Sequence, residues 1–134
     1  MQNRYNRKNR RKYSLKVHIV LVTKYRKTLL QNGMDDFVKK SINYLAKQNQ
    51  WNIIAMETDK DHIHILLEYD ATERICDIIY IIKQRTTHWL WMRYKAFLSK
   101  HYWKKHTFWS DGYFACSIGE VSSVTIEKYI SEQG

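Results

Sequence analysis

Two histidines separated by one residue form the sharpest chemical feature of the sequence. His62 and His64 lie in an apolar run that is typical of a β-strand. Side chains alternate between the two faces of a strand, so both imidazoles point to the same side and can converge on one metal ion or one phosphate group. Asp61 directly precedes the pair and can accept a hydrogen bond from a metal-bound imidazole. A His-x-His spacing by itself is weak evidence for such a site, and the alternative interpretation is two polar residues on a solvated face of a sheet.

A tyrosine and a glutamine form a second pair near the end of the chain. Tyr129 and Gln133 are four residues apart in a segment that is expected to be helical, so they lie one above the other on one helix face. The alternative interpretation is that the tyrosine only packs beside Ile126 and Ile130, and that the glutamine has no role.

Residues 83–109 combine basic and aromatic side chains without a single acid. Basic charge holds phosphates, and aromatic faces stack on unpaired bases at roughly 1–3 kcal/mol each. We therefore expect nucleic-acid contacts in this segment, with Lys83 and Arg85 among them. The competing interpretation is that about half of the aromatic residues fill the core beneath a long helix. Trp89 and Trp91 are only two residues apart and must point in different directions on a helix.

Positive charge is concentrated at the start of the chain. The 134 residues include 23 Lys and Arg against 13 Asp and Glu, a net charge of +10. Residues 1–34 hold ten of the basic residues and no acid, and the remainder holds 13 of each sign. We interpret residues 1–12 as a basic arm and expect DNA contacts from Arg10, Arg11 and Lys12. A positive surface confined to one part of a chain favours a polyanionic partner.

Length and composition favour one globular domain over residues 13–134, because a chain of this size can bury its own core. No apolar run reaches the roughly 18 residues that a membrane span needs, and no secretory signal core follows the basic N-terminus. Cys76 and Cys116 lie on apolar stretches far apart in the sequence. They are expected to be buried, reduced thiols of a cytosolic protein.

The elements that must position these residues follow from the hydrophobic periodicity. The expected order is a strand at 13–23, a helix at 34–50, strands at 51–57 and 62–69, a helix from 72 to at least 95, a strand at 113–118 and a helix at 122–133. Two strand–helix–strand units in this order predict an α+β, ferredoxin-like sandwich, with an antiparallel sheet covered by helices on one face. The other face is expected to stay open, as in RNA-recognition modules.

Taken together, four stretches resemble the single-tyrosine HUH transposases of bacterial and archaeal insertion sequences, which move as single-stranded DNA. The stretches occur in the order found in that family and span nearly the whole chain, and the second and fourth together make the resemblance specific. They are His18-Ile19-Val20 with Lys24-Tyr25-Arg26; residues 57–66, which contain the two histidines; Gly112-Tyr113-Phe114 with Ser117-Ile118-Gly119; and Tyr129-Ile130-Ser131-Glu132-Gln133.

The resemblance implies an activity and a set of roles. His62, His64 and Gln133 would bind a divalent metal, Mg²⁺ or Mn²⁺, and Tyr129 would attack a scissile phosphate near a DNA hairpin. The attack would leave a 5′-phosphotyrosine and a free 3′-OH, and rejoining of the strands would complete excision and insertion. The further implied DNA contacts are His18, Lys24, Tyr25 and Arg26.

The resemblance also implies the partners and the location. The DNA would be single-stranded and would contain a hairpin. The protein would be a homodimer in which one subunit supplies the histidines and the other supplies the tyrosine helix. Such an enzyme is expected in the cytoplasm of a prokaryote, at the nucleoid.

Three other functions remain open on the sequence alone. A non-catalytic binding module for single-stranded DNA or RNA could use the same fold, but it would have no need of the Tyr129–Gln133 pair. A phosphoesterase with two histidine motifs is disfavoured because the expected fourth strand offers no second His-x-His. A replication initiator of the wider HUH class is disfavoured because such proteins tend to be longer and often carry a helicase or a second tyrosine.

Overall fold

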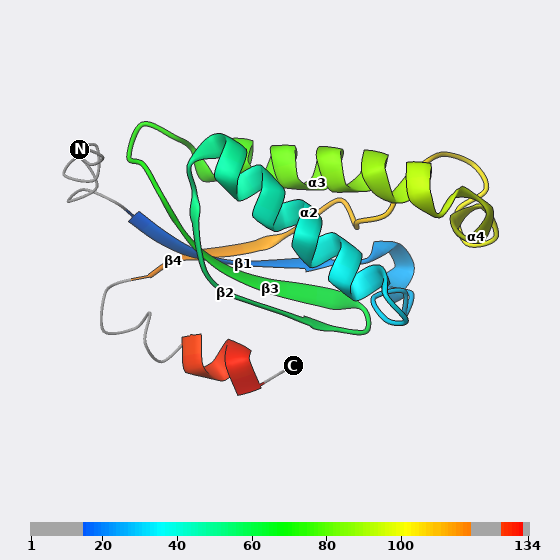
Figure 1. Cartoon of the computed structure of the whole chain (residues 1–134), viewed down its shortest axis with the longest axis horizontal. Coiled ribbons are helices and arrows are strands. Elements are labelled where there is room, and N and C mark those ends of the chain that lie inside the picture. Colours follow the sequence, from blue (N-terminus) through cyan, green and yellow to red (C-terminus); the bar gives the residue numbers. More distant parts are fainter. Residues whose placement is uncertain (1–14, 119–126, 133–134) are drawn as a thin grey trace.

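The computed structural model describes residues 15–118 and 127–132. Four strands form one antiparallel sheet in the spatial order β2-β3-β1-β4, with helices α2 and α3 on one face (Figure 1). The strands are β1 Leu15–Val22, β2 Asn52–Asp59, β3 His62–Tyr69 and β4 Phe114–Ser117. The helices are η2 Lys24–Arg26, α2 Met34–Asn49, α3 Ile75–Arg93 and α4 Lys95–Ser99. This order confirms the predicted ferredoxin-like, α+β fold.

The core lies between the sheet and the two long helices. Alternate residues of β1 and β3 face the helices, as strand alternation requires, and six of them are fully buried: Val17, Ile19, Leu21, Ile63, Ile65 and Leu67. Val38 and Ile42 of α2 and Ile78 and Ile82 of α3 meet them from the other side. The register of β1 and β3 pairs Val20 with His64, which fixes the face on which the histidines lie.

The opposite face of the sheet is not fully open, contrary to the expectation. Residues 127–132 are helical and lie on this face, below the sheet in Figure 1. Ile130 of this segment is fully buried, and so is Leu66, which points from β3 away from the helix-side core. An apolar contact surface on the second face therefore holds the C-terminal helical segment close to the histidines.

The second long helix is shorter than predicted. It begins at Ile75 because the turn before it is held by side chains: Glu73 accepts hydrogen bonds from the backbone of Asp70 and from the indole of Trp51. It ends at Arg93, because Tyr94 leaves the helical conformation (φ −121°, ψ 33°). The ring of Tyr94 packs edge-on against Phe37 of α2, so a tertiary contact overrides the local helical preference.

The expectation for the two cysteines is wrong. Cys76 and Cys116 are both free thiols, but both are exposed. Cys76 lies in the first turn of α3 on its outer side, and Cys116 lies on β4, an edge strand of the sheet. Within the described part of the chain, no helix is long and apolar enough to cross a membrane.

Candidate active site on the second face of the sheet

The two histidines of β3 lie on one face, as their spacing predicts. The ring centroids of His62 and His64 are 5.0 Å apart, with the planes at 74°. Ile63 and Ile65 point into the core on the other side and are fully buried. Strand alternation therefore separates the apolar residues that hold β3 in place from the two imidazoles that it presents.

Asp61 orients His62. Its Oδ1 atom lies 2.7 Å from Nδ1 of His62, and its Oδ2 atom accepts a hydrogen bond from Nε of Arg26 at 3.2 Å. The bond to His62 and the charge of Arg26 hold the pKa of the Asp61 carboxyl below its usual value, so the carboxylate is an acceptor only. Nδ1 of His62 must then carry the proton, which leaves the Nε2 lone pair of a neutral His62 available to a ligand.

A third histidine joins the pair. His18 of β1 is 8% exposed, and its Nε2 atom lies 3.1 Å from Nδ1 of His64, which is also 8% exposed. Burial lowers the pKa of His18; burial and the neighbouring His62 and His18 lower the pKa of His64 to about 4. Both rings are therefore neutral near pH 7. The burial of His18 places it beneath the surface on which we expected it to contact DNA.

Tyr129 lies beside this cluster within the same chain. Its ring meets the ring of His64 edge-on, with the centroids 6.0 Å apart and the planes at 82°. The tyrosine is 52% exposed, so its hydroxyl is accessible, whereas the next residue, Ile130, anchors the segment by burial. The helical segment thus presents a potential nucleophile at the edge of the histidine cluster. Gln133, the expected neighbour of Tyr129, lies outside the described residues.

The donor atoms at this site fit a divalent metal in part. Neutral imidazole nitrogen is a good ligand for first-row divalent ions, and the Nε2 atom of His62 is left free by its bond to Asp61. Among residues 15–118 and 127–132, no group of three or more His, Cys, Asp and Glu side chains is arranged around a common metal position. The described part of the site thus offers the two nitrogen donors of His62 and His64, and a full site needs a further ligand such as Gln133.

The predicted DNA contacts Lys24, Tyr25 and Arg26 form the short helix η2 at the end of β1. Tyr25 and Arg26 both have left-handed backbone conformations (φ 61° and 53°), which are uncommon for side chains of their size. The carbonyl of Lys24 accepts a hydrogen bond from the buried hydroxyl of Tyr102, and burial raises the pKa of Tyr102 to about 12. This support holds Tyr25 with 74% of its surface exposed.

A hollow of about 510 Å³ lies beside this loop. We call it the end hollow, because it lies at the end of the sheet where β1 meets η2. It combines cationic and aromatic groups, and Trp103 at its rim is 76% exposed. The lining residues are Lys24, Tyr25, His101, Tyr102, Trp103, Lys104, Lys105 and Thr107. Half of the eight aromatic residues of segment 83–109 are buried in the core, although Tyr102 among them also lines the end hollow: Trp91, Tyr102, Phe108 and Trp109.

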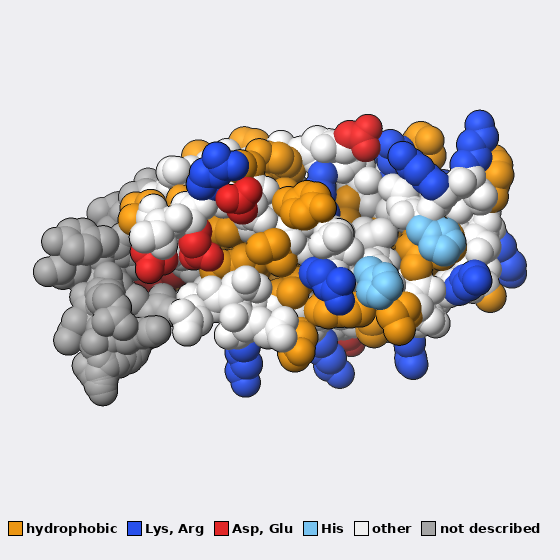
Figure 2. All heavy atoms as spheres, turned by 90° about the horizontal axis from the view of Figure 1, so that it is seen from above, with side chains coloured by type: hydrophobic (Ala, Val, Ile, Leu, Met, Phe, Trp, Pro, Cys, Tyr) orange, Lys and Arg blue, Asp and Glu red, His pale blue; other side chains and the backbone are white. Residues whose placement is uncertain are grey.

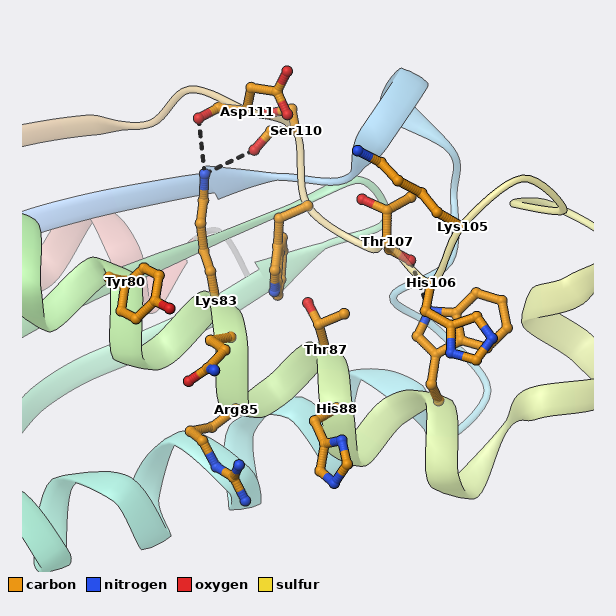
Figure 3. Close-up of a pocket in the computed structure, with 13 residues that line it drawn as sticks. Tyr80, Lys83, Arg85, Thr87, His88, Lys105, His106, Thr107, Ser110 and Asp111 are labelled. Carbon is orange, nitrogen blue, oxygen red and sulfur yellow. Dashed lines mark hydrogen bonds between the residues drawn. The ribbon is translucent and has the colours of Figure 1, made fainter.

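Lys83 and Arg85 are less available than the sequence suggested. The ammonium group of Lys83 donates to the backbone carbonyls of Ser110, Asp111 and Gly112 at 2.7, 3.1 and 3.0 Å, two of which are drawn in Figure 3. These bonds engage all three of its donors. Arg85 points away from Lys83 in the same view, and its guanidinium lies 4.9 Å from the ring of Trp89 on the helix side of the molecule. Lys83 therefore clamps the segment that leads into β4.

Replacement of this clamp is expected to affect stability. Lys83→Met keeps the aliphatic stem but leaves three carbonyls without their donor, so we expect the free energy of unfolding to fall by about 1–3 kcal/mol. Urea denaturation followed by circular dichroism measures the change. Lys95→Met, an exposed lysine of α4, is the matched control and is expected to change stability by less than about 0.5 kcal/mol. Equal effects of the two substitutions would contradict the clamp.

Three features of the site escaped the sequence analysis. They are the contact of His18 with His64, the bond of Arg26 to Asp61 and the capture of Lys83 by three carbonyls. The first depends on the register of β1 against β3, and the others depend on loops that meet only in the folded chain. Arg10, Arg11 and Lys12 of the expected arm lie outside the described residues.

Comparison with known proteins places this site in a family. The family model described as "Transposase IS200 like" matches residues 11–133. The ISDra2 transposase TnpA of Deinococcus radiodurans is 28% identical over 121 residues, which cover 90% of this chain and 85% of that protein. The transposase for insertion sequence element IS200 of Salmonella typhimurium is 25% identical over 122 residues, covering 91% of this chain and 78% of the relative.

Solved structures agree with the fold. The crystal structure of a Deinococcus radiodurans protein assigned as a transposase has a TM-score of 0.73 and 26% identity, covering 90% of this chain and 92% of that one. A REP-associated tyrosine transposase bound to a REP hairpin has a TM-score of 0.64 and 13% identity, covering 87% of this chain and 64% of that one; it supports the fold alone. The resemblance seen in the sequence is confirmed: the chain belongs to the IS200-like transposases, enzymes that transfer DNA strands.

Proposed function

We propose that the chain is a metal-dependent transposase for single-stranded DNA in which Tyr129 is the nucleophile. The observation that carries the proposal is the contact of the Tyr129 ring with His64, on the face that His64 shares with His62. A tyrosine hydroxyl, the imidazoles of His62 and His64 and an orienting carboxylate then lie together at one accessible position. This combination suits transfer of a phosphoryl group to the hydroxyl.

The covalent step balances without a further co-reactant. The hydroxyl oxygen of Tyr129 attacks the scissile phosphorus, and the bond from phosphorus to the 3′ oxygen breaks. Tyrosine loses its proton, the departing 3′ oxygen takes one up, and a 5′-phosphotyrosine remains. Attack by a 3′-OH in the reverse direction restores a phosphodiester and frees Tyr129, so no ATP is needed to rejoin strands.

His62 and His64, with Gln133 as third ligand, would hold the metal. When bound, Mg²⁺ or Mn²⁺ would neutralise the negative charge that develops on the scissile phosphate. Asp61 keeps the proton of His62 on Nδ1 through the 2.7 Å hydrogen bond. Arg26, bonded to the same carboxylate, holds η2 against the β2–β3 turn and thereby links the loop of predicted DNA contacts to the ligand histidine.

The DNA is proposed to lie across the end of the sheet. The end hollow also contains further lysines and Trp103, in addition to Lys24 and Tyr25. The lysines can bind phosphates, and the aromatic ring of Trp103 can stack on an unpaired base. A second hollow, shown in Figure 3, shares Lys105 and Thr107 with the end hollow and continues along α3. On the helix side, most Lys, Arg and His side chains gather over the half that carries α4 (Figure 2). The basic arm with Arg10, Arg11 and Lys12 would add further phosphate contacts.

The proposal includes a homodimer with shared active sites. Tyr129 meets the histidine of its own chain, and the segment that carries it rests on the sheet through few buried groups, chiefly Ile130. The same contact can be made to the sheet of a second subunit if the segments exchange. Such an exchange would let one tyrosine carry its bound strand from one site to the other.

Incubation with labelled element ends tests the proposal. Single-stranded DNA that carries the hairpin and its flank, labelled at the 5′ or the 3′ end, is mixed with the protein and Mn²⁺. A denaturation-resistant protein–DNA species that retains only the label downstream of the cut is expected, together with a free fragment ending in a 3′-OH. Binding without any such species would favour the alternative, a non-catalytic module for single-stranded DNA or RNA.

The end hollow is expected to contribute stacking and charge separately. Trp103→Ala should weaken binding of the single-stranded DNA by about 1–3 kcal/mol and leave the salt dependence unchanged, because stacking is not ionic. Lys105→Ala should reduce the slope of log affinity against log salt by about one.

For the unmodified protein, affinity should fall by about 10³ or more between 50 and 200 mM salt if six or more phosphates are held.

Fluorescence anisotropy over a salt series measures both effects of the end-hollow substitutions. Met92→Ala, an exposed apolar residue of α3 that does not line the end hollow, is the control. If Trp103→Ala and Met92→Ala bind DNA alike, the hollow is not a contact surface. A flat salt profile of the unmodified protein would contradict the role of charge.

A further inference from the structure

His18 is buried at the proposed metal site without belonging to the ligand set. We propose that His18 is a positioning residue: its Nε2 atom accepts the proton of His64 Nδ1 and so fixes the tautomer in which Nε2 of His64 offers its lone pair to the metal. The inference rests on the proposed function for the metal, and it assigns to His18 a role other than the DNA contact expected from the sequence.

The geometry is that of an in-plane hydrogen bond between two imidazoles. The planes of His18 and His64 differ by only 12°, while their centroids are 5.3 Å apart, too far for rings stacked face to face. That separation matches the 3.1 Å between the two nitrogens plus the radius of each ring, so the bond lies nearly along the line that joins the ring centres. One nitrogen points directly at the other.

Counting protons sets the direction of the bond. Each neutral imidazole has one N–H and one lone pair, and a hydrogen bond between two nitrogens needs one of each. If His64 donates from Nδ1, its Nε2 lone pair is free and His18 carries its own proton on Nδ1. In the reverse arrangement, Nε2 of His64 would carry the proton and could not ligate. Only the first arrangement is compatible with His64 as a ligand through Nε2.

The surroundings of His18 hold it in place for this task. Its ring is met edge-on by Phe114 of β4, with the centroids 5.9 Å apart, so the imidazole lies between β3 and the edge strand. The register pairs Val20 with His64 and His18 with Leu66, which makes His18 the diagonal neighbour of His64 on the same face. At 3.1 Å, Nε2 of His18 and Nδ1 of His64 are within hydrogen-bond distance, and such a bond holds one proton between the two nitrogens.

The two ligand histidines are thus oriented by two different acceptors. His62 donates Nδ1–H to the carboxylate of Asp61, and His64 would donate Nδ1–H to the imidazole of His18. Acceptors of this kind fix the rotation of a ligating ring, and their loss typically weakens metal binding by about 10–100-fold. A neutral acceptor at His64 adds no negative charge beside the phosphate that the site must approach.

Two substitutions at His18 test the proposal. His18→Gln retains an acceptor oxygen near the position of Nε2, whereas His18→Phe keeps a planar ring of similar shape without an acceptor. Long-range ¹H–¹⁵N NMR of the metal-free chain reports the tautomer of His64 directly. Titration with Mn²⁺, followed by electron paramagnetic resonance, reports the affinity for the metal.

We expect His64 to be protonated at Nδ1 in the unmodified chain and in His18→Gln, and to lose that preference in His18→Phe. Mn²⁺ affinity should fall about 10–100-fold in His18→Phe and recover at least in part in His18→Gln. A proton on Nε2 of His64 in the unmodified chain would overturn the proposal, and so would equal Mn²⁺ affinities of the two variants.

The outcomes also separate this inference from the proposed function. If the unmodified chain binds no Mn²⁺, the metal site of the proposed function fails, while the NMR tautomer still decides the role of His18. If His18→Phe does not fold, the tautomer in the unmodified chain and the Mn²⁺ affinity of His18→Gln decide it. If His18→Gln loses its affinity for Mn²⁺ but keeps the proton of His64 on Nδ1, His18 is itself a metal ligand. That result would contradict the proposal.

Discussion

Replacement of Tyr129 by phenylalanine is expected to abolish the covalent protein–DNA adduct and to leave DNA binding nearly unchanged. The substitution removes one oxygen atom, the atom that would form the bond to phosphorus, and keeps the ring that meets His64. Since Tyr129 is 52% exposed and its neighbour Ile130 anchors the segment, the loss of a hydroxyl should change the free energy of unfolding by less than about 0.5 kcal/mol. A loss of adduct in Tyr129→Phe can therefore be attributed to the missing hydroxyl and not to a change in folding.

The measurement for Tyr129→Phe is the fraction of labelled single-stranded DNA that remains attached to protein after denaturation. Anisotropy with the same DNA measures binding, and thermal unfolding confirms the fold. Tyr113→Phe is the matched control, because this second exposed tyrosine precedes β4 and should form adduct at the normal level. Adduct formed by Tyr129→Phe would move the nucleophile to another residue, and loss of binding would make the tyrosine a DNA contact.

The fold was largely predictable because it depends on local periodicity. Alternation of apolar residues identified β3 at the bounds that the structure gives, and with it the common face of His62 and His64. The long helix α2 differs from its expected range only by ending at Asn49 instead of residue 50. These patterns reflect which face of each element is buried, and a single sequence contains that information.

What could not be predicted depends on residues that are distant in sequence. The bond between His18 and His64 joins residues 46 positions apart and exists only because β1 and β3 pair in one register. A shift of that register by one residue would place the two rings on opposite faces of the sheet. Lys83 is expected from the sequence to contact DNA because it lies in the acid-free, basic and aromatic segment 83–109, yet three carbonyls of a segment 27 to 29 residues away engage it. The break at Tyr94 likewise depends on a partner, Phe37, in another helix.

The wrong expectation for the cysteines has the same origin. An apolar stretch shows that an element is partly buried but does not say which residues at its ends or edges are covered. Cys76 lies in the first turn of α3, and Cys116 lies on a strand that is paired on one side only within the sheet. Neither position has enough neighbouring residues to bury a side chain, so both thiols are exposed.

Removal of the metal, or of a ligand that holds it, is expected to stop DNA cleavage while DNA binding persists. A tyrosine hydroxyl is almost fully protonated at neutral pH and is a weak nucleophile. Charge neutralisation by a bound metal lowers the barrier by several kcal/mol, so its loss should slow cleavage by roughly 10³-fold or more. Both chelation by EDTA and the substitution His64→Ala are expected to remove this contribution, because His64 is one of the two proposed metal ligands on β3.

The decisive comparison combines the two perturbations. In the unmodified chain, EDTA should abolish adduct formation and Mn²⁺ should restore it. In His64→Ala, the residual rate should be low and EDTA should lower it no further, because a site without its ligand has no bound metal to lose. Met92→Ala, at an exposed residue of α3 that lines neither hollow, should retain normal rates and normal sensitivity to EDTA. Cleavage that persists in EDTA would remove the metal from the mechanism, and rates for His64→Ala that Mn²⁺ raises to normal would show that His64 is not a required ligand.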